Sequence, residues 1–573
     1  MSRQNIPGAS NPLAGQLKGS ANSFEDNTNT ASVGNAFPQR PASIHVPPSR
    51  DATQQRPTDL DVARSLTQAN IEIRPDVEHD PKDYAPSDEE ADRSSSDNKD
   101  PEKEPHYPNS SGSSSLVPAT KEYDPTQLLE LPSQRGNRLY RAFRWQFFSV
   151  YRKIYTVVFL LNLIWGVVGF SFGRFGDNIY ASGKFASDSV ASAVAVNVMV
   201  AIAVRNEHVI NVLFSSAIAM PHWMPLWFRR SCAMIYSYGG FHSGCASASA
   251  VWYAVYTGVA IREYTSERQP SPVFVVLSSI LLSLLVAIIV LALPNIRQKY
   301  HNNFECVHRF AGWTVLGLFW AQLIASAILG SRMTNTDAGI TLITSPAFWF
   351  LTAATLLVIY PWARLRKRPV QVDSLSAHAI RIHFDFGRPA IGSAIRLADR
   401  PLRENHAFAT IPRDDGKPGF SVVVSKAGDW TRRMISHPPR SLYVRSGPNQ
   451  GMVAVTKLFS PVVLIATGSG IGPCLGFFVD APGHDVRVIW STKNPLSTYG
   501  PAVLDMVKKA DPNAHIIDTD KTGRPDIVKL AYTVYRESKA EAVCIISNKK
   551  VVDMVVFGME TRGVPAYGPI WDS

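Results

Sequence analysis

A cluster of glycines in the C-terminal part of the chain has the spacing of a phosphate-binding turn. Gly468, Ser469, Gly470, Gly472 and Pro473 come directly after the aliphatic run VVLIAT, which begins at residue 462. A buried strand that ends in closely spaced glycines and leads into a helix brings backbone N–H groups and a positive helix N-terminus to a phosphate. A tight strand-to-helix connection without a ligand is the alternative. The sequence therefore predicts a nucleotide-binding site at this turn.

The segments around this turn predict two β-containing modules. VVLIATG, HDVRVIWST, AHIIDTD and EAVCIISN alternate with helical patterns and are expected to be buried strands of a parallel sheet. Before them, up to about Lys457, the chain shows short alternating strands, with AHAIRIHFDF and GFSVVVSKAG among them. We expect an antiparallel β-barrel followed by a doubly wound α/β domain.

Six apolar stretches precede these modules. Each is long enough to cross, or nearly cross, the roughly 30 Å hydrocarbon layer of a membrane at about 1.5 Å per residue. The stretches are Ile154 to Phe170, Ala186 to Val204, Ser231 to Ile261, Val273 to Leu293, Phe310 to Leu329 and Leu342 to Tyr360. The second is the weakest, because Asp188 stands at its start and the segment HVINVLFSSAIAM after it fits an interfacial helix.

The distribution of basic residues predicts an orientation in the membrane. Lys and Arg gather before the first span, between the second and third, between the fourth and fifth, and after the sixth. By the positive-inside bias both termini are cytosolic, in the plasma membrane or another endomembrane. The same clusters account for the net charge of +11, so a nucleic-acid partner is not expected and the lipid bilayer is.

The chain divides by composition into four regions. Residues 1–126 are rich in Ser, Pro, Asn, Asp and Glu and are expected to be a disordered cytosolic tail, with no secretory signal at the start. The transmembrane bundle is expected over residues 135–368, the barrel over 369–458 and the α/β domain over 459–573. The five cysteines indicate neither a disulfide framework nor a zinc site.

Two segments of the expected barrel carry a family resemblance. His406-Ala407-Phe408-Ala409-Thr410 is similar to a His-Pro-Phe-Thr-like flavin segment, and Lys426 with Gly428-Asp429-Trp430-Thr431 is similar to a Gly-Asp-Trp-Thr turn. With six spans before them and the glycine turn after them, residues 135–573 resemble the ferric reductase and NADPH oxidase superfamily. The likeness is greatest to a fungal branch of TmpA-type transmembrane flavo-oxidoreductases.

The resemblance implies cofactors and roles. His406, Ala407, Phe408 and Thr410 would stack on and hydrogen-bond the isoalloxazine ring of FAD. Backbone amides of the Gly428 to Thr431 turn, with Lys426, would hold the flavin phosphates. The glycine turn would bind the pyrophosphate of NAD(P)H, and Tyr567 or Trp571 near the chain end would cover the flavin face. Packing of these aromatics against the sheet is an equal alternative.

The tripeptide Ser491-Thr492-Lys493 bears on the choice of dinucleotide. It follows the second expected strand of the α/β domain, where hydroxyls and a cation would meet a 2′-phosphate. This placement favours NADPH over NADH, and a surface loop without that role is equally compatible.

The membrane spans depart from the superfamily pattern of two histidine pairs that hold stacked haems. His242 has Phe228 and Tyr256 at the positions fourteen residues away, and His308 has Gln322. Counted from Arg230, His242 would lie about 18 Å into its helix, whereas His308 starts its span, so the two imidazoles are expected at different depths. No metal site and no transmembrane haem relay are therefore predicted, with His242 and His308 as the only haem candidates.

The last expected strand also departs from the family. Related reductases place a Cys-Gly-Pro-like turn against the nicotinamide, and this chain has Ile546-Ser547-Asn548, with Cys544 two positions too early. Because hydride transfer needs close approach of nicotinamide and flavin, the change predicts less efficient turnover.

The sequence thus supports three hypotheses. The first is a membrane-bound NAD(P)H-dependent flavin oxidoreductase that passes electrons to an unidentified acceptor. The second is a catalytically degenerate regulator that senses redox state or nucleotide, and the third is a haem-containing metal reductase.

Overall fold

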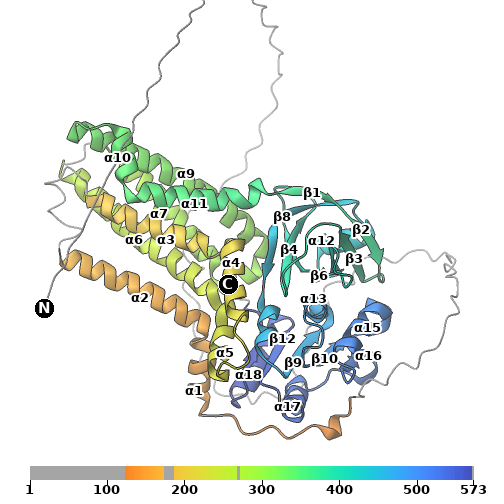
Figure 1. Cartoon of the computed structure of the whole chain (residues 1–573). Coiled ribbons are helices and arrows are strands. Elements are labelled where there is room, and N and C mark those ends of the chain that lie inside the picture. The colour runs from red at the N-terminus through yellow and green to blue at the C-terminus, as the bar shows by residue number, and fades with distance from the viewer. Residues whose placement is uncertain (1–122, 173–185, 268–270, 571–573) are drawn as a thin grey trace, which may run out of the picture. The chain divides into compact units, whose positions relative to one another are not determined.

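The computed structural model describes residues 123–172, 186–267 and 271–570. The expected tail over residues 1–126 lies almost entirely outside the described residues, and so does Trp571. Between these limits a helical part is followed by two modules built on β-sheets, in the expected order (Figure 1).

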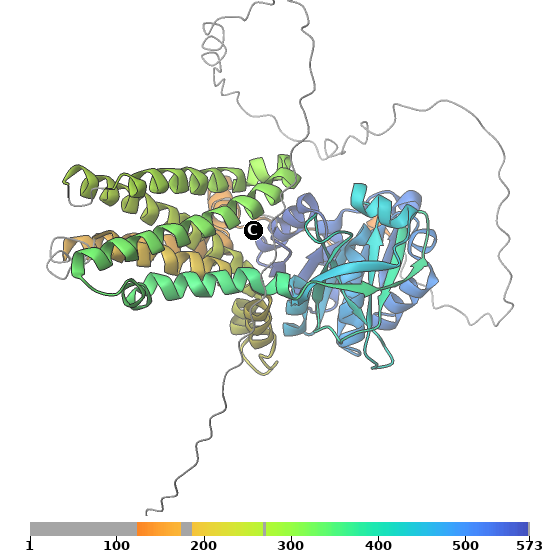
Figure 2. The same ribbon diagram turned by 90° about the horizontal axis from the view of Figure 1, so that it is seen from above.

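Long apolar helices form the first part. Within the described ranges, five helices are long and apolar enough to cross a membrane, or six if one bent pair counts as a single span. They run alongside one another in both ribbon views (Figure 2). The main helices are α2 (Val150–Ser171), α3 (Ala186–Ala203), α6 (Gly239–Thr265), α7 (Val273–Ala292), α9 (His301–Thr334) and α11 (Pro346–Ala363).

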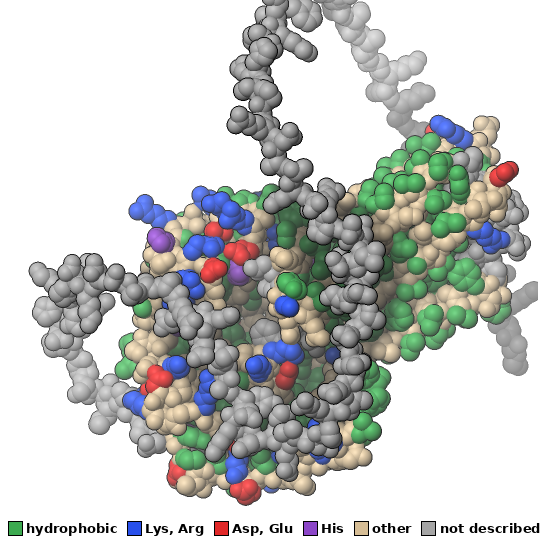
Figure 3. Space-filling model, turned by 180° about the vertical axis from the view of Figure 1, so that it is seen from behind, with side chains coloured by type: hydrophobic (Ala, Val, Ile, Leu, Met, Phe, Trp, Pro, Cys, Tyr) green, Lys and Arg blue, Asp and Glu red, His purple; other side chains and the backbone are tan. Residues whose placement is uncertain are grey.

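The surface of this part is typical of a membrane-embedded bundle. Hydrophobic side chains gather over the helices, whereas Lys, Arg, Asp and Glu are more frequent over the β modules (Figure 3). In α2, for example, Leu161, Ile164 and Trp165 are all more than half exposed. Such a continuous apolar surface is unusual on a protein that meets only water, and it supports the expected transmembrane spans.

The third expected span lies within one candidate span, Leu226–Thr265, which is not α-helical throughout. The apolar stretch from Ser231 to Ile261 contains the end of α5 (Leu226–Ala233), a 3-10 turn η5 (Met234–Tyr238) and then α6. Gly240 and Gly244 let α6 approach α2 closely: a Cβ on Gly240 would lie 2.5 Å from the carbonyl oxygen of Tyr151. The 3-10 turn η5 thus interrupts the α-helix inside the candidate span, and α6 itself begins at Gly239.

The segment after the second span forms helix α4 (Glu207–Ile218), bent by 65° from α3. This helix packs on a β-strand: Asn211 Nδ2 donates to the Pro448 carbonyl oxygen at 3.0 Å, and Asn211 Oδ1 accepts the Gln450 N–H at 2.8 Å. Ser215 adds a bond to the Gln450 side chain at 2.8 Å. The helix expected at the membrane interface thus joins the bundle to the first β module.

The first β module consists of two antiparallel sheets, as predicted. One has the order β1 (Arg366–Pro369), β8 (Ser441–Gln450), β4 (Ser393–Ala398), β5 (His406–Ala409). The other has the order β2 (Gln371–Ser374), β3 (Ala379–Phe384), β7 (Phe420–Ser425), β6 (Ile411–Pro412). Alternating inward side chains such as Ile380, Ile382 and Val422 form the core, which helix α12 (Asp429–Ser436) closes with Trp430.

The second β module is a five-stranded parallel sheet, also as predicted. Its order is β11 (His515–Asp518), β10 (Val486–Thr492), β9 (Val462–Thr467), β12 (Ala542–Ile546), β13 (Ala566–Tyr567). Residues of α13 (Ile471–Asp480) and α15 (Pro501–Ala510) belong to one core, and those of α17 (Ile527–Glu537) and α18 (Lys549–Glu560) belong to another. Helices therefore cover both faces, and the glycine turn follows the central strand β9.

Candidate functional site

The glycine turn begins immediately after β9 and runs into α13. Gly468 has a φ of +50°, a conformation that glycine adopts without steric cost. A Cβ on Gly470 would lie 2.2 Å from the Ile546 carbonyl oxygen, so this glycine is needed for packing. Added Cβ atoms on Gly468 and Gly472 would meet nothing within 4 Å. Open space thus lies beside two of the three glycines, at the N-terminal end of α13, where a phosphate is favoured.

The residues that replace the expected Cys-Gly-Pro turn have structural partners here. The Ser547 hydroxyl is hydrogen-bonded to the Thr467 hydroxyl at the end of β9. The Asn548 side chain caps α18 by accepting the Val551 N–H at 3.1 Å. Cys544 is buried within β12, and burial raises the pKa of its thiol to about 12. No reactive thiolate therefore stands at this edge among the described residues.

The tripeptide after the second strand differs from its predicted environment. Ser491 and Thr492 are the last residues of β10 and are buried, and only Lys493 is exposed. The next residue, Asn494, donates its N–H to Asp518 Oδ1 at 3.0 Å. The predicted loop hydroxyls therefore lie inside the strand, and the cation that could meet a 2′-phosphate is Lys493 alone.

The expected flavin segment lies on β5 and packs against α12. The His406 and Trp430 rings have centroids 4.7 Å apart, and Phe408 stacks on Trp430 at 5.6 Å and 26°. His406 Nε2 and Trp430 Nε1 are buried atoms without a hydrogen-bond partner in the described chain. The His406 side chain is 37% exposed. The Trp430 indole therefore packs on the His406 and Phe408 rings and leaves part of His406 accessible.

Thr410 and Thr431 have other roles than the resemblance implied. The Thr410 hydroxyl is 2.9 Å from the Ser393 hydroxyl and donates to the Ser393 carbonyl oxygen at 3.0 Å. The Thr431 hydroxyl accepts the backbone N–H groups of Ala427 and Gly428, both at 2.9 Å. One of the amides expected to hold a flavin phosphate, that of Gly428, is thus occupied within the turn, while the first N–H groups of α12 stay available.

A pair of arginines that the sequence analysis missed lies on the strands beside the flavin segment, on the sheet face opposite His406 and Phe408. Arg396 on β4 is the direct cross-strand partner of Ala407 on one side and of Arg445 on β8 on the other. Like charges directly opposite each other destabilise a sheet. Burial, with repulsion from Arg396 and Arg309, lowers the pKa of Arg445 to about 10. This arrangement favours a bound anion between the two guanidinium groups.

The bundle contributes to the same region. The Trp362 ring at the end of α11 lies under two guanidinium groups, that of Arg445 at 4.8 Å and that of Arg309 at 5.8 Å. Arg309 also donates to the Leu402 carbonyl oxygen at 3.1 Å. Each of these elements carries a basic residue that is visible in the sequence. Only the folded structure shows that these basic residues lie close together.

The flavin segment and the glycine turn are adjacent. Helix α13, which starts at the turn, packs against β6 and β5, and a Cβ on Gly476 would lie 2.2 Å from the Thr410 carbonyl oxygen. This contact tolerates only glycine and fixes the two candidate half-sites side by side.

The two candidate haem histidines contradict the expected difference in depth. The His242 and His308 ring centroids are 6.3 Å apart with planes inclined by 59°. His242 lies in the first turn of α6, directly after the 3-10 turn η5. His242 Nδ1 is 2.8 Å from the Ala201 carbonyl oxygen, and the buried His308 Nδ1 has no hydrogen-bond partner within the described residues.

The terminal aromatics have one described member. Tyr567 on β13 is 1% exposed, stacks on Phe459 at 5.2 Å and meets Tyr236 edge-on. It packs in the core, so the packing alternative holds for Tyr567, and Trp571 lies outside the described residues.

Comparison with known proteins relates the chain to reductases. Residues 452–573 match the family described as "Adenylate-forming reductase 03009, C-terminal domain". The chain is similar to adenylate-forming reductases. Adenylate-forming reductases 03009 and 06235 of Coprinopsis cinerea are 38% and 39% identical to it over 445 and 448 residues, or 77% and 78% of the chain. The alignments cover 42% of each relative, so the chain spans less than half their length.

Solved structures show more distant likeness. The ferredoxin reductase in carbazole 1,9a-dioxygenase is 14% identical with a TM-score of 0.30, covering 36% of this chain and 70% of that one. A flavohemoglobin from Malassezia yamatoensis is 15% identical with a TM-score of 0.33, covering 67% of this chain and 98% of that one. The relatives' names agree with a reductase module, and the ferric reductase and TmpA-type assignment stays a prediction.

Proposed function

We propose that the chain is a membrane-bound flavoprotein oxidoreductase that takes electrons from NAD(P)H through FAD to an acceptor still to be identified. The observation that carries the proposal is the juxtaposition of two half-sites. An arginine pair and the rings of His406, Phe408 and Trp430 lie on the antiparallel sheets. A glycine turn with open space beside it lies on the parallel sheet, and α13 connects the two.

The residues present fit FAD. Arg396 and Arg445 supply the paired positive charge that a diphosphate needs, and they relieve their mutual repulsion by binding it. His406 Nε2 and Trp430 Nε1 offer unsatisfied polar atoms beside the ring-stacking surface of Phe408. Leaving such buried groups unpaired costs about 1–3 kcal/mol each, which a ligand with matching polar atoms would recover.

The residues at the glycine turn fit a dinucleotide. Gly468 and Gly472 leave room for a pyrophosphate at the N-terminus of α13, and exposed Lys493 favours NADPH. FAD, when bound, supplies the chemistry of accepting a hydride and releasing single electrons. The chain's own part is to hold the two ligands next to each other across the contact of Gly476 with Thr410.

The long apolar helices support a membrane location for this chemistry. We infer an integral membrane protein with both termini in the cytosol, because the positive residues flank the bundle at the β modules, where Arg364, Arg366, Lys367 and Arg368 follow α11. The membrane is the plasma membrane or another endomembrane.

Flavin binding by the full chain in detergent is the direct test. We expect the purified protein to be yellow, or to take up one equivalent of added FAD with quenching of flavin fluorescence. Protein that is folded by thermal unfolding analysis and binds no added FAD would refute the proposal. Protein that binds FAD but never oxidises NADPH or NADH would instead be the degenerate sensor.

The histidine pair favours a second candidate, a reductase with one haem. His242 and His308 would be the residues that hold a haem, because His242 Nδ1 is 2.8 Å from a backbone carbonyl oxygen, which leaves Nε2 for a metal, and the His308 ring lies close by on α9. When bound, haem would supply one-electron chemistry.

Absorbance separates this candidate from the haem-free one. A Soret band that is present in the wild type and lost in both His242→Ala and His308→Ala would establish it. A wild-type protein prepared with added haem that shows no Soret band would exclude it.

A further inference from the structure

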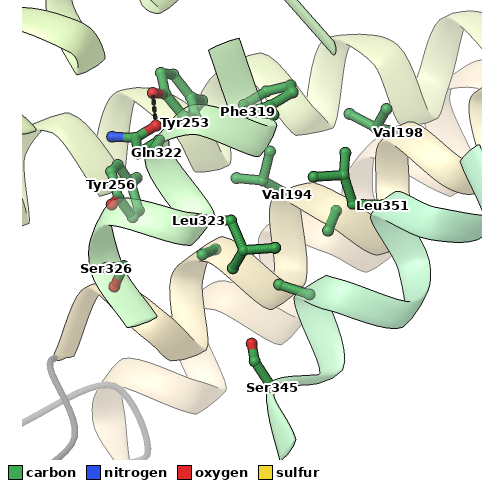
Figure 4. Close-up of a pocket in the computed structure, with 13 residues that line it drawn as sticks. Val194, Val198, Tyr253, Tyr256, Phe319, Gln322, Leu323, Ser326, Ser345 and Leu351 are labelled. Atoms are coloured by element: carbon green, nitrogen blue, oxygen red, sulfur yellow. Dashed lines mark hydrogen bonds between the residues drawn. The ribbon is translucent and has the colours of Figure 1, made fainter. Parts of the chain in front are cut away.

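A cavity lies among the helices of the bundle. Its walls come from α3, α6, α9 and the start of α11, and Tyr256 and Gln322 are among its lining residues (Figure 4). These are the positions fourteen residues after His242 and His308. Helices α6 and α9 thus keep facing each other at the cavity, with a phenol and an amide in place of imidazoles.

The wall of the cavity has a polar side and an apolar side. Tyr253, Gln322, Tyr256 and Ser326 follow one side, and Val194, Val198, Leu323 and Leu351 form the other (Figure 4). The rings of Tyr253 and Tyr256 are stacked at 5.4 Å and 10°, and Phe319 meets Tyr253 edge-on at 5.3 Å. A flat ring would find an aromatic surface beside hydrogen-bonding groups.

The Gln322 side chain is held by two hydrogen bonds and can form more. The Tyr253 hydroxyl donates to Gln322 Oε1 at 2.5 Å, and Gln322 Nε2 donates to the Ser278 hydroxyl at 2.8 Å. All three side chains belong to residues that are at most 4% exposed. An amide can take part in four hydrogen bonds, and these two leave one N–H and one oxygen lone pair for a ligand.

The composition and size of the cavity restrict its ligand. None of its thirteen lining residues is Lys, Arg, Asp, Glu or His, so a charged ligand would be buried without a counter-charge. The cavity measures about 50 Å³, where one water needs about 10–15 Å³ on the same measure. Roughly four waters, or one substituted six-membered ring, fill such a space, and a porphyrin is far too large.

We propose that this cavity binds a small uncharged ring compound that carries a hydroxyl or carbonyl oxygen, of the phenol or quinone class. The ring lies against Tyr253, Tyr256 and Phe319, and its oxygen bonds to Gln322. The inference does not depend on the flavin or nucleotide sites, because binding requires only the bundle.

Fluorine NMR of the full chain in detergent tests the proposal with para-fluorophenol as the probe. We expect saturable binding above the partitioning seen in protein-free micelles, and at least tenfold weaker binding of fluorobenzene, which lacks the oxygen. Gln322→Leu should weaken para-fluorophenol by about tenfold, the value of one buried hydrogen bond, and leave fluorobenzene unchanged.

Filling the cavity gives the second arm. Leu351→Trp should abolish saturable binding, whereas the matched control Leu356→Trp, on the same helix at a residue that is 62% exposed, should retain it. Equal binding of the two probes, or equal binding by the two tryptophan variants, would overturn the proposal. The Gln322→Leu variant is tested with both probes and does not rely on Leu351→Trp. The proposal can therefore still be refuted if Leu351→Trp fails to fold.

Discussion

At the scale of single residues, the paired guanidinium groups of Arg396 and Arg445 carry the proposed anion site. The strands hold the two cations opposite each other, and Arg445 is half-buried, so their repulsion is costly without a bound anion. A ligand diphosphate removes this cost, so binding energy and relief of repulsion act together.

Arg445→Met tests this residue pair. We expect FAD affinity to fall at least tenfold, because a buried charge-assisted contact is lost. The ligand-free protein should unfold at the same temperature or a higher one, because the repulsion is gone too. Fluorescence titration and thermal unfolding measure the two effects. Arg413→Met, which changes an exposed arginine paired with Asp415, is the control. A loss of stability with unchanged FAD affinity would speak against the anion site.

Glu560 at the end of α18 predicts a pH dependence. Burial raises the pKa of its carboxyl to about 7, although Arg144 and Lys153 act in the opposite direction. The folded protein therefore holds this proton more tightly than the unfolded chain, so the stability contributed is present at low pH and lost as the pH rises through 7.

Glu560→Gln should consequently raise the thermal midpoint above about pH 8, by roughly 2–4 °C, and change it little below about pH 4.5. Scanning fluorimetry across this range measures the effect, with the exposed Asp505→Asn as the charge-matched control. An equal shift at both ends of the range would show that the carboxyl is not the cause.

At the scale of elements, helices and strands were predicted most accurately where turn residues bound an apolar run. All four expected strands of the parallel sheet formed, because runs such as VVLIAT are uniformly apolar and end at glycine. The break between α5 and α6 could not be predicted in this way, because the stretch from Ser231 to Ile261 stays apolar through η5.

The candidate site shows the same limit. Its local motifs, the glycine turn and the His406 segment, were found from spacing and resemblance. Arg396 and Arg445 were missed because they meet through cross-strand register, beside an irregularity between Ala394 and Arg396, and register leaves no local signal in the sequence. The meeting of His242 and His308 was missed because it depends on where α6 starts.

At the glycine turn we expect one substitution to weaken nucleotide binding and a neighbouring one to lower stability. Gly472→Val points into open space and should keep the fold while weakening NADPH binding at least tenfold. Gly470→Ala should lower stability instead, because its Cβ would meet the Ile546 carbonyl oxygen at 2.2 Å. Thermal unfolding and NADPH titration distinguish them, with Gly258→Val as a control at another open helical glycine. NADPH binding that survives Gly472→Val would place the dinucleotide elsewhere.

At the scale of the whole molecule, a buried ion pair joins the helical part to the parallel-sheet module. Arg229 on α5 is 4% exposed and makes two 2.7 Å bonds to the Glu541 carboxylate, which also accepts the Ser460 N–H at 2.9 Å. Arg229 further donates to the Leu458 carbonyl oxygen at 2.6 Å. The linker between the two β modules is thereby fixed to the bundle.

Arg229→Met should destabilise the protein by about 3 kcal/mol, because it leaves a partly buried carboxylate unpaired. Adding Glu541→Leu should restore much of this loss, since no charge then remains without its partner. Thermal unfolding measures both. Arg487→Met, at an exposed pair with Asp485, should have little effect. If the double variant is no more stable than Arg229→Met alone, the unpaired Glu541 carboxylate is not the cause of the destabilisation.

Anaerobic addition of NADPH to the FAD-loaded full-length protein tests whether the nucleotide reduces the flavin. We expect the absorbance band of oxidised flavin to be bleached, and Gly472→Val to slow this bleaching at least tenfold while FAD stays bound. Flavin that remains oxidised in the wild-type protein with NADPH and with NADH would show that the protein is not an NAD(P)H-dependent flavin reductase.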